Sequence, residues 1–457
     1  MSPHASDDDV APRPTAPAAA PAPALDPYPH LHLRPSSGWV NDPNGFLRHH
    51  GRWHLFYQLN PHSPRHADIH WGHASSTDLV RWEHEPVALA PRPDGPDANG
   101  CWSGTAVVVD DVPVLAYTAV RTRPESAGVV LATPDDPADP HLAAWTAEDD
   151  VVCPMPADAG LFEIRDPFFV TLGGHRWALQ AGRTVEDTPV VRVFLVDDLH
   201  DWQDAGTLLA GTGTDDPWAP GHMWECPQLV RVDGAWVLVV SRWRLGPSGA
   251  SDAVLGPVAA IVGDVHLGAV GTPGGGPRFR PRTSVLLDDG PDFYAPQALV
   301  EPDRVVLVGW TWEHRDAAEV DAAGWAGALT FPRELGVRDG HVLSWPAREV
   351  EALRGERLGA GTDVRVAAAA FEVLDEELAS ATGTGTELVL ALDGPQGARV
   401  VWRSAGTGPV RVLVDGSVVE AFVDGRAHTV RAYPRPGETW HVRAAAPVVV
   451  HALRLPG

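Results

Sequence analysis

The sequence predicts an all-β fold, in which a five-bladed β-propeller is followed by a C-terminal β-sandwich. Glycine and proline are both abundant, at 45 and 44 of 457 residues. Helical periodicity is scarce, so many short strands joined by turns are expected. Clusters of polar and aromatic residues recur at a nearly constant interval over most of the chain. The last part shows short strands broken by Asp-Gly turns, which are typical of hairpins in a β-sandwich.

The recurring clusters set the number of blades. Their markers follow one another at intervals of 61, 63, 59 and 69 residues, and they are Asp42, Ser103, Asp166, Glu225 and Tyr294. A propeller blade is a four-stranded sheet that faces a central channel, and five units of this size account for the chain from about residue 30 to 350. Equivalent positions of the blades face the same end of the channel. We therefore expect the three acidic markers to lie close together.

Four segments follow from these patterns. We expect a disordered Ala/Pro-rich tail at 1–27, a propeller at 28–345, a linker at 346–362 and a β-sandwich at 363–457. The linker begins with a charged run of helical character, and the sandwich begins where alternating strands resume.

Composition restricts the partners. The formal charge of −25 and the pI near 5.1 argue against nucleic acid, because phosphate backbones are bound by clustered basic residues. The three cysteines are too few and too widely spaced for a disulfide framework. No apolar run is long enough to span a membrane, and the N-terminus lacks the pattern of a secretory signal. We expect a cytoplasmic protein that binds neither nucleic acid nor a membrane, and its oligomeric state stays open.

The turn-prone run at 41–45, Asn-Asp-Pro-Asn-Gly, raises the question of whether Asp42 makes a turn or performs chemistry. Each of these residue types favours turns, so the run alone needs no functional reason. Cleaving a glycosidic bond with retention requires two carboxyl groups, one as nucleophile and one as proton donor. A further fixed acid can hold the sugar hydroxyls. Asp42, Asp166 and Glu225 would meet this requirement if the repeat brings them together.

Eight motifs resemble those of glycoside hydrolase family 32, the β-fructofuranosidases, and they occur in the family's order. They are WVNDPNG at 39–45, FYQLNP at 56–61, HWGHASSTDLVRWEH at 70–84, CWSGTAV at 101–107, RDP at 165–167, MWECPQL at 223–229, FYAPQ at 293–297 and GWAGALTFPREL at 324–335. The resemblance continues through 410–426 and so covers nearly everything after the tail. It implies a propeller followed by a sandwich, in agreement with the spacing argument.

The resemblance also implies roles for individual residues. Asp42 matches the nucleophile, Glu225 the general acid/base, and Asp166 the acid that holds the fructosyl hydroxyls at the transition state. The residues that match sugar-contacting positions are Trp39, Asn41, Gln58, Trp71, Trp102, Ser103, Arg165 and Trp325. Neither a metal nor a cofactor is implied.

One segment departs from the family pattern. Where many members have a Trp-Gly pair before the HWGH motif, this chain has Arg65-His66-Ala67-Asp68, so an aromatic wall of the pocket is missing or comes from elsewhere. His62, Arg65 and His66 could instead form a basic patch for a phosphorylated sugar.

Three further features have simple structural interpretations. The histidines at 62, 66, 70 and 73 are interpreted as loop residues, because no carboxylate or cysteine with ligand spacing accompanies them. Cys226 is expected to be a buried structural thiol. Glu420 matches a recurrent family position that could affect oligomer contacts, but we expect it to be exposed on a sandwich strand.

The leading functional hypothesis is an enzyme that hydrolyses sucrose, with sucrose 6-phosphate as an open possibility and fructans as poor substrates. Transfer of the fructosyl group to another sugar is an alternative reaction at the same site, and a fructan-acting exo-hydrolase is an alternative activity. A sugar-binding propeller without activity is the hypothesis from another class, and three retained acids argue against it.

Overall fold

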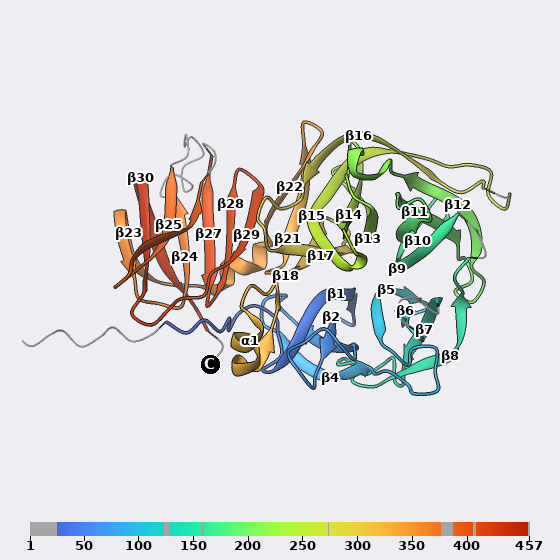
Figure 1. The fold of residues 1–457 in the computed structure, drawn as a ribbon, viewed down its shortest axis with the longest axis horizontal. Helices are drawn as coiled ribbons and strands as arrows, with labels where there is room; N and C mark the ends of the chain where they lie inside the picture. Colours follow the sequence, from blue (N-terminus) through green and yellow to red (C-terminus); the bar gives the residue numbers. More distant parts are fainter. Residues whose placement is uncertain are drawn as a thin grey trace, which may run out of the picture.

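The computed structural model describes residues 25–122, 128–156, 160–272, 274–375, 387–404 and 408–455, without the side chains of 250–252. Two β domains lie side by side, the propeller and the sandwich (Figure 1). The predicted tail lies outside the described residues up to residue 24. Leu25, which was assigned to the tail, is buried in the core of the sandwich. Within the described part, no helix has the length and apolar character needed to cross a membrane.

The propeller consists of five antiparallel sheets whose first strands contact one another around the centre (Figure 1). Blade 1 contains β1 (Gly38–His49), β2 (Arg52–Asn60), β3 (His70–Ser76) and β4 (Glu83–Leu89). Blade 2 contains β5 (Cys101–Val109), β6 (Val112–Ala119), β7 (Gly128–Pro134) and β8 (Trp145–Cys153). Blade 3 contains β9 (Leu161–Leu172), β10 (His175–Thr184), β11 (Pro189–Leu195) and β12 (Gln203–Ala210).

The last two blades follow a 3-10 helix, η1 (Gly213–Asp215). Blade 4 contains β13 (Met223–Val232), β14 (Ala235–Gly246), β15 (Gly249–His266) and β16 (Arg278–Leu286). Blade 5 contains β17 (Phe293–Val300), β18 (Val305–Thr311), β20 (Ala328–Leu329), β21 (Arg333–Arg338) and β22 (His341–Pro346). The expectation of a five-bladed propeller is thus confirmed.

The ring is closed by a short parallel pairing. Strand β19 (Trp325–Ala326) pairs with β1, with Gly38 opposite Trp325. The single α-helix of the described residues, α1 (Ala317–Ala323), precedes β19. Its N-cap Asp316 and Glu319 form a reciprocal capping box, which satisfies two backbone donors at the start of the helix. Gly324 ends it at φ 71°, in the left-handed conformation that glycine adopts without strain.

Each first strand carries an irregularity at its marker. The pairing register shifts between Val40 and Pro43 in blade 1 and between Trp102 and Gly104 in blade 2. It also shifts next to Arg165 in blade 3, between Glu225 and Gln228 in blade 4, and between Tyr294 and Gln297 in blade 5. A bulge bends the strand and redirects a side chain. The repeated clusters in the sequence therefore correspond to bulges at the same level of every blade.

The C-terminal domain is one hydrogen-bonded sheet that folds over itself into two layers. Its strands are β23 (Arg354–Val366), β24 (Ala370–Asp375), β25 (Leu388–Gly394), β26 (Gly397–Arg403), β27 (Val410–Asp415), β28 (Val418–Val423), β29 (Arg426–Arg431) and β30 (Thr439–Leu453). The first half of β30 pairs with β25 and the second half with β24, so this strand passes from one layer to the other. The predicted linker contains the 3-10 helix η2 (Arg348–Leu353) and the first part of β23.

The contact between the domains is charged and buried. Arg333 of blade 5 is fully buried and bonds through Nε to Oε2 of Glu420 at 2.8 Å, and through Nη1 to Asp288 at 2.7 Å. Nε2 of His32 donates to Oε1 of the same glutamate at 3.0 Å. The expectation that Glu420 is exposed is therefore wrong. Burial alone would raise the pKa of Glu420, but the charge of Arg333 and the His32 hydrogen bond lower it.

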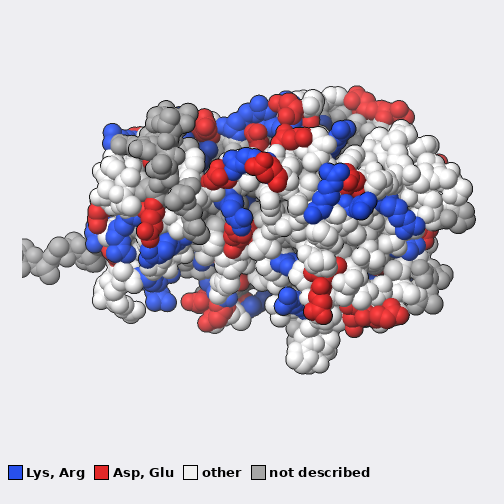
Figure 2. All heavy atoms as spheres, turned by 90° about the horizontal axis from the view of Figure 1, so that it is seen from above, with Lys and Arg blue, Asp and Glu red and all other residues white. Residues whose placement is uncertain are grey.

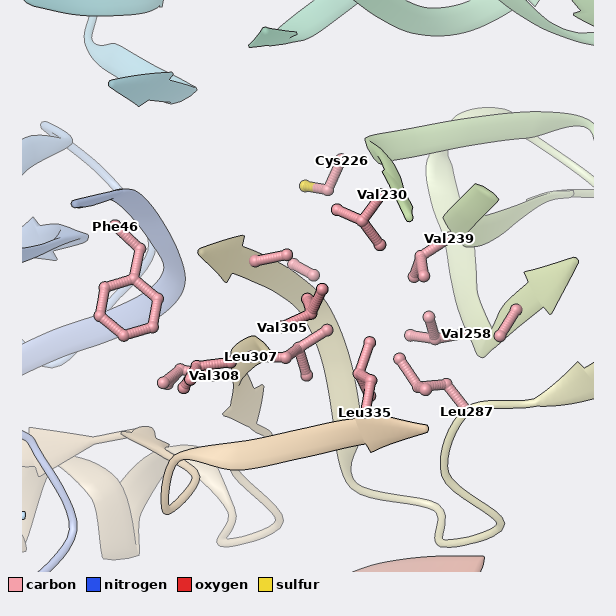
Figure 3. Packing of buried hydrophobic residues seen from close by; sticks show 14 of the residues in the cluster. Phe46, Cys226, Val230, Val239, Val258, Leu287, Val305, Leu307, Val308 and Leu335 are labelled. Atoms are coloured by element: carbon pink, nitrogen blue, oxygen red, sulfur yellow. The ribbon is translucent and has the colours of Figure 1, made fainter. Parts of the chain in front are cut away.

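Buried apolar side chains from several blades form one large cluster in the propeller. Figure 3 shows part of this cluster, with Phe46 of β1 on one side, Val305 and Leu307 of β18 in the middle, and Cys226 and Val230 of β13 above them. On the face shown in Figure 2, both arginine and acidic side chains are spread over the surface.

Candidate functional site

A cavity of about 610 Å³ opens among the first strands of the propeller. Its lining combines three carboxylates, one guanidinium, polar groups and a wall of aromatic rings. The lining residues are Trp39, Asn41, Asp42, Gln58, His66, Trp102, Ser103, Arg165, Asp166, Glu225, Trp243, Leu255, Tyr294 and Trp310. Asp42, Asp166 and Glu225 therefore do converge, although they come from β1, β9 and β13.

Asp42 lies in a network of donors. Ser103 donates to its Oδ2 at 2.6 Å and Asn41 donates to its Oδ1 at 3.1 Å. The indole N–H of Trp39 donates to Asn41 Oδ1 at 2.8 Å. The side-chain amide of Asn41 also donates to Gln58 Oε1 at 2.8 Å. Burial raises the pKa of Asp42 to about 6, with a further increase from the charge of Glu225, while the Ser103 hydrogen bond acts in the opposite direction.

Asp166 and Cys226 share an unusual backbone feature. Both precede a proline and both have positive φ, at 61° and 47°. This conformation is uncommon for side chains other than glycine, and such strain is concentrated at functional sites. It lets the backbone N–H of Cys226 donate to Asp166 Oδ2 at 3.0 Å. Burial raises the pKa of Asp166 to about 7, against the charge of Arg165, and Glu225 adds to the increase.

The thiol of Cys226 is buried, as expected from the sequence. Its Sγ lies 3.7 Å from Oδ2 of Asp42 and 3.6 Å from Oδ2 of Asp166, so one sulfur touches both carboxylates. Burial and these charges raise the pKa of the thiol far above its ordinary value, which keeps it protonated as a weak donor.

Glu225 is held from two sides. Arg165 donates through Nη2 to Oε1 at 2.6 Å, and the hydroxyl of Tyr294 lies 2.6 Å from Oε2. The other arm of Arg165 binds Glu163 at 2.6 Å. The Tyr294 hydroxyl also lies 3.1 Å from the carbonyl oxygen of Arg242. It therefore has a second acceptor available whenever Glu225 carries a proton.

Aromatic rings enclose the remaining walls. The guanidinium of Arg165 lies 5.3 Å from the ring centroid of Trp102 and 5.6 Å from that of Trp243. Trp310 meets Trp39 edge-on, with centroids 5.8 Å apart. His66 also meets Trp39 edge-on at 6.0 Å, so this histidine supplies a ring where the family's tryptophan is absent.

Two predicted sugar contacts lie elsewhere. Trp71 is fully buried, and its indole N–H donates to the carbonyl of Trp102 at 3.1 Å, so it supports the cavity wall from behind. Trp325 is buried under Arg34 and Arg315, whose guanidinium carbons lie 4.2 and 3.9 Å from its ring centroid. Neither lines the cavity, and we no longer propose them as sugar contacts.

Five lining residues were not predicted as site residues. Two of them could have been found from the sequence. Tyr294 is one of the repeat markers, and His66 lies in the segment that differs from the family pattern. Trp243, Leu255 and Trp310 left no signal in the sequence. Trp243 and Leu255 are a cross-strand pair on the β14–β15 hairpin, and only the folded hairpin brings them to the cavity.

The suggested basic patch does not form in this structure. Arg65 makes a 2.6 Å ion pair with Asp321 and donates to the carbonyl of Ala317 at 2.7 Å, both on α1. His62 lies near Asp68 instead. Outside the cavity, two groups of described residues could share a metal ion, and they are His62, Asp68 and His70, and Glu83, Glu85 and His141.

Comparison with known proteins agrees with this geometry. The profile described as the glycosyl hydrolases family 32 N-terminal domain matches residues 32–346. The chain belongs to this family. Raffinose invertase from Escherichia coli is 34% identical over 329 residues, which are 72% of this chain and 66% of that protein. A sucrose-6-phosphate hydrolase from Escherichia coli is 30% identical over 452 residues, or 90% of each chain.

Solved structures show the same architecture. The Bombyx mori GH32 beta-fructofuranosidase, solved in complex with sucrose, superposes with a TM-score of 0.73 at 25% identity and covers 94% of this chain and 95% of its own. A Lactobacillus gasseri sucrose-6-phosphate hydrolase superposes with a TM-score of 0.75 at 24% identity, over 94% of each chain. The chain spans slightly less than two thirds of the raffinose invertase and of a Zymomonas mobilis sucrose-6-phosphate hydrolase, at 66% and 63%.

Proposed function

We propose that this protein is a retaining β-fructofuranosidase that releases fructose from sucrose. The observation that carries the proposal is the convergence of Asp42, Asp166 and Glu225 on one cavity, at positions that match the family's nucleophile, stabilising acid and acid/base. A buried set of three acids beside one guanidinium is costly for a protein to maintain without a use.

In the first step, the Asp42 carboxylate attacks the anomeric carbon of the fructosyl unit while Glu225 protonates the departing glucosyl oxygen. Asp42 can do this near neutral pH because its pKa, although raised to about 6, still leaves it mostly ionised at pH 7. In the second step, Glu225 removes a proton from water, which attacks the covalent intermediate and releases fructose.

Other residues support this chemistry. Asp166 binds the fructosyl hydroxyls as positive charge develops on the ring. Tyr294 can turn its hydroxyl from Glu225 to the carbonyl of Arg242 when the acid is protonated, so both states of Glu225 have hydrogen-bond partners. Trp102 and Trp39 offer apolar faces to the sugars.

Charge favours sucrose over a phosphorylated sugar. The cation in the lining, Arg165, is already paired with Glu163 and Glu225, and the nearby Arg65 is paired with Asp321. A sugar phosphate would therefore meet three carboxylates without a strong counter-charge. Three of the similar proteins are named for sucrose 6-phosphate, whereas we propose that this chain prefers the unphosphorylated sugar.

The deciding experiment compares kcat/KM for sucrose, sucrose 6-phosphate, inulin and levan, with glucose and free fructose measured separately. We expect sucrose to be the best substrate and to give equal amounts of glucose and fructose. An excess of glucose would show fructosyl transfer. A higher kcat/KM for inulin, levan or sucrose 6-phosphate would contradict the proposal that sucrose is the preferred substrate. Binding of sucrose without formation of product would contradict the proposal that the protein is a hydrolase.

A further inference from the structure

The four histidines at positions 62, 66, 70 and 73 lie in three different environments. His73 is buried in β3 and stacks on Phe56 with ring centroids 4.2 Å apart. His66 lines the catalytic cavity. The remaining two, His62 in the β2–β3 loop and His70 at the start of β3, meet edge-on with ring centroids 5.5 Å apart at 77°.

Asp68 completes a group of three. Its Oδ2 lies 3.7 Å from Nε2 of His62, and the ligand atoms of His62, Asp68 and His70 all lie within 4.8 Å of one another. Around a tetrahedral Zn²⁺ with bonds of about 2.0–2.2 Å, ligand atoms are roughly 3.3 Å apart. His62 and Asp68 are exposed, at 71% and 53% of their side chains, so packing does not prevent their side chains from rotating toward one another.

One ring nitrogen of His70 is held by the backbone. Its residue is 9% exposed, and its Nδ1 lies 2.7 Å from the backbone carbonyl oxygen of Asp68. A carbonyl accepts but does not donate, so Nδ1 carries the proton and Nε2 has the free lone pair. Histidines that bind metals commonly have their second nitrogen fixed in this way.

The loop backbone is also held in place before any ion binds. The buried Asn60 accepts from the backbone N–H of His62 at 2.9 Å, and it donates to the carbonyl of Arg65 at 2.9 Å. The backbone N–H of Ala67 donates to the same carbonyl at 2.9 Å. A loop that is already ordered loses less conformational entropy when its side chains bind an ion.

We propose that His62, Asp68 and His70 form a binding site for a divalent transition metal, with Zn²⁺ as the best match. Two imidazoles and one carboxylate are the donor set that Zn²⁺ accepts, and the exposed side leaves a fourth position for water. The same loop carries His66 to the catalytic cavity, so a bound ion would restrict the residue that stands in for the family's missing aromatic wall.

The second group close enough to share an ion is a weaker candidate. Glu83 is within 3.1 Å of the Arg52 guanidinium, and the hydroxyl of Ser75 donates to Glu85 at 2.5 Å. A fixed positive charge at that position opposes the approach of a cation.

The test is calorimetric titration of tag-free protein with Zn²⁺ alone, repeated on Asp68→Asn, His62→Gln, His50→Gln and His141→Gln. We expect one ion per chain in the native protein and in His50→Gln, whose exposed histidine lies at the far end of β1. In Asp68→Asn and His62→Gln we expect affinity to fall at least tenfold. Asparagine tolerates the positive φ of 48° at position 68, so this variant should keep the loop fold.

Co²⁺ gives a second measurement that does not depend on enzyme activity. The native protein should develop the visible absorption of four-coordinate Co²⁺, and Asp68→Asn should lose it. Binding that is unchanged in both Asp68→Asn and His62→Gln would overturn the site, as would the absence of saturable binding in the native protein. Binding that disappears only in His141→Gln would assign the ion to the Glu83 group and contradict the proposal.

Discussion

The hydroxyl of Ser103 donates a 2.6 Å hydrogen bond to Oδ2 of Asp42, across the boundary between blades 1 and 2. This hydrogen bond favours the ionised carboxylate and partly offsets the effect of burial on the Asp42 pKa. Ser103 is therefore expected to influence the pH range of the reaction and not merely the shape of the pocket.

Ser103→Ala should raise the pKa of Asp42 above its present value of about 6. Because the nucleophile must be ionised, the acidic limb of the kcat/KM profile should move to higher pH, and kcat/KM at neutral pH should fall about tenfold or more. The measurement is a pH-rate profile on sucrose. Ser284→Ala, in blade 4, is the matched control. The hydroxyl of Ser284 donates only to the carbonyl of Trp218. An acidic limb that does not move in Ser103→Ala would disprove the effect of the Ser103 hydrogen bond on the pKa of Asp42.

Asp42→Asn should remove turnover while the fold is retained, because the covalent intermediate cannot form without the carboxylate. We expect less than about a hundredth of native kcat on sucrose. Circular dichroism and the Tm should match the native protein. Activity above that level in a folded variant would rule out Asp42 as the nucleophile.

Glu225→Gln should slow sucrose hydrolysis by on the order of 10² to 10⁴, but should slow an activated aryl fructoside far less, because a good leaving group needs no proton. The same change removes a negative charge that raises the pKa of Asp42. The acidic limb measured with the aryl substrate should therefore move to lower pH. Equal slowing on both substrates would contradict the acid role.

Glu420→Gln should destabilise the protein, because Arg333 and His32 would lose the charge that compensates them in a fully buried contact. Breaking one partner of a buried ion pair costs about 3–5 kcal/mol. The control is Glu387→Gln, whose pair with Arg403 is more than half exposed on both sides. The measurement is the Tm of both variants. A similar decrease in Tm in both would disprove that the buried Glu420 stabilises the protein more than an exposed glutamate does.

His54 and His73 form a buried pair whose ring nitrogens lie 3.1 Å apart. Burial lowers the pKa of His54 to about 3 and that of His73 well below its ordinary value. The unfolded chain therefore binds more protons between about pH 3 and 6.5, so stability should be complete above pH 6.5 and decline below it. His54→Gln should reduce the difference in Tm between pH 7.5 and 5, whereas the exposed control His50→Gln should not. An unchanged difference in His54→Gln would contradict this account.

The sequence predicted the blades and the three acids because both depend on a regular spacing. The bulge at each first strand needs particular local residues, such as proline after Asp166 and Cys226, and these leave a recurring pattern. The wall of the cavity has no such pattern. Trp243 and Leu255 come from a hairpin whose length and twist decide where they point, and no local preference encodes that.

The wrong expectations for Trp71 and Glu420 have different physical causes. Trp71 lies within a recognisable motif, but a strand alternates its side chains between faces, so proximity to site residues in sequence does not show which residue faces the sugar. Glu420 seemed exposed because a charged residue on a strand is usually solvated. Its partner Arg333 lies 87 residues earlier in the chain, and such long-range pairing is visible only after folding. Asp68, His62 and His70 lie close together because the loop between β2 and β3 turns back on itself.

The first described residues attach the start of the propeller to the sandwich. Leu25 packs in the sandwich core, and the backbone N–H groups of His30 and Leu31 donate to Asp415 at 2.9 and 2.7 Å. The same chain then continues directly into β1, which carries Asp42 and closes the ring with β19. Separation of the two domains would therefore pull on the strand that positions Asp42, the proposed nucleophile. None of the described lining residues belongs to the sandwich, yet unfolding of that domain should abolish activity.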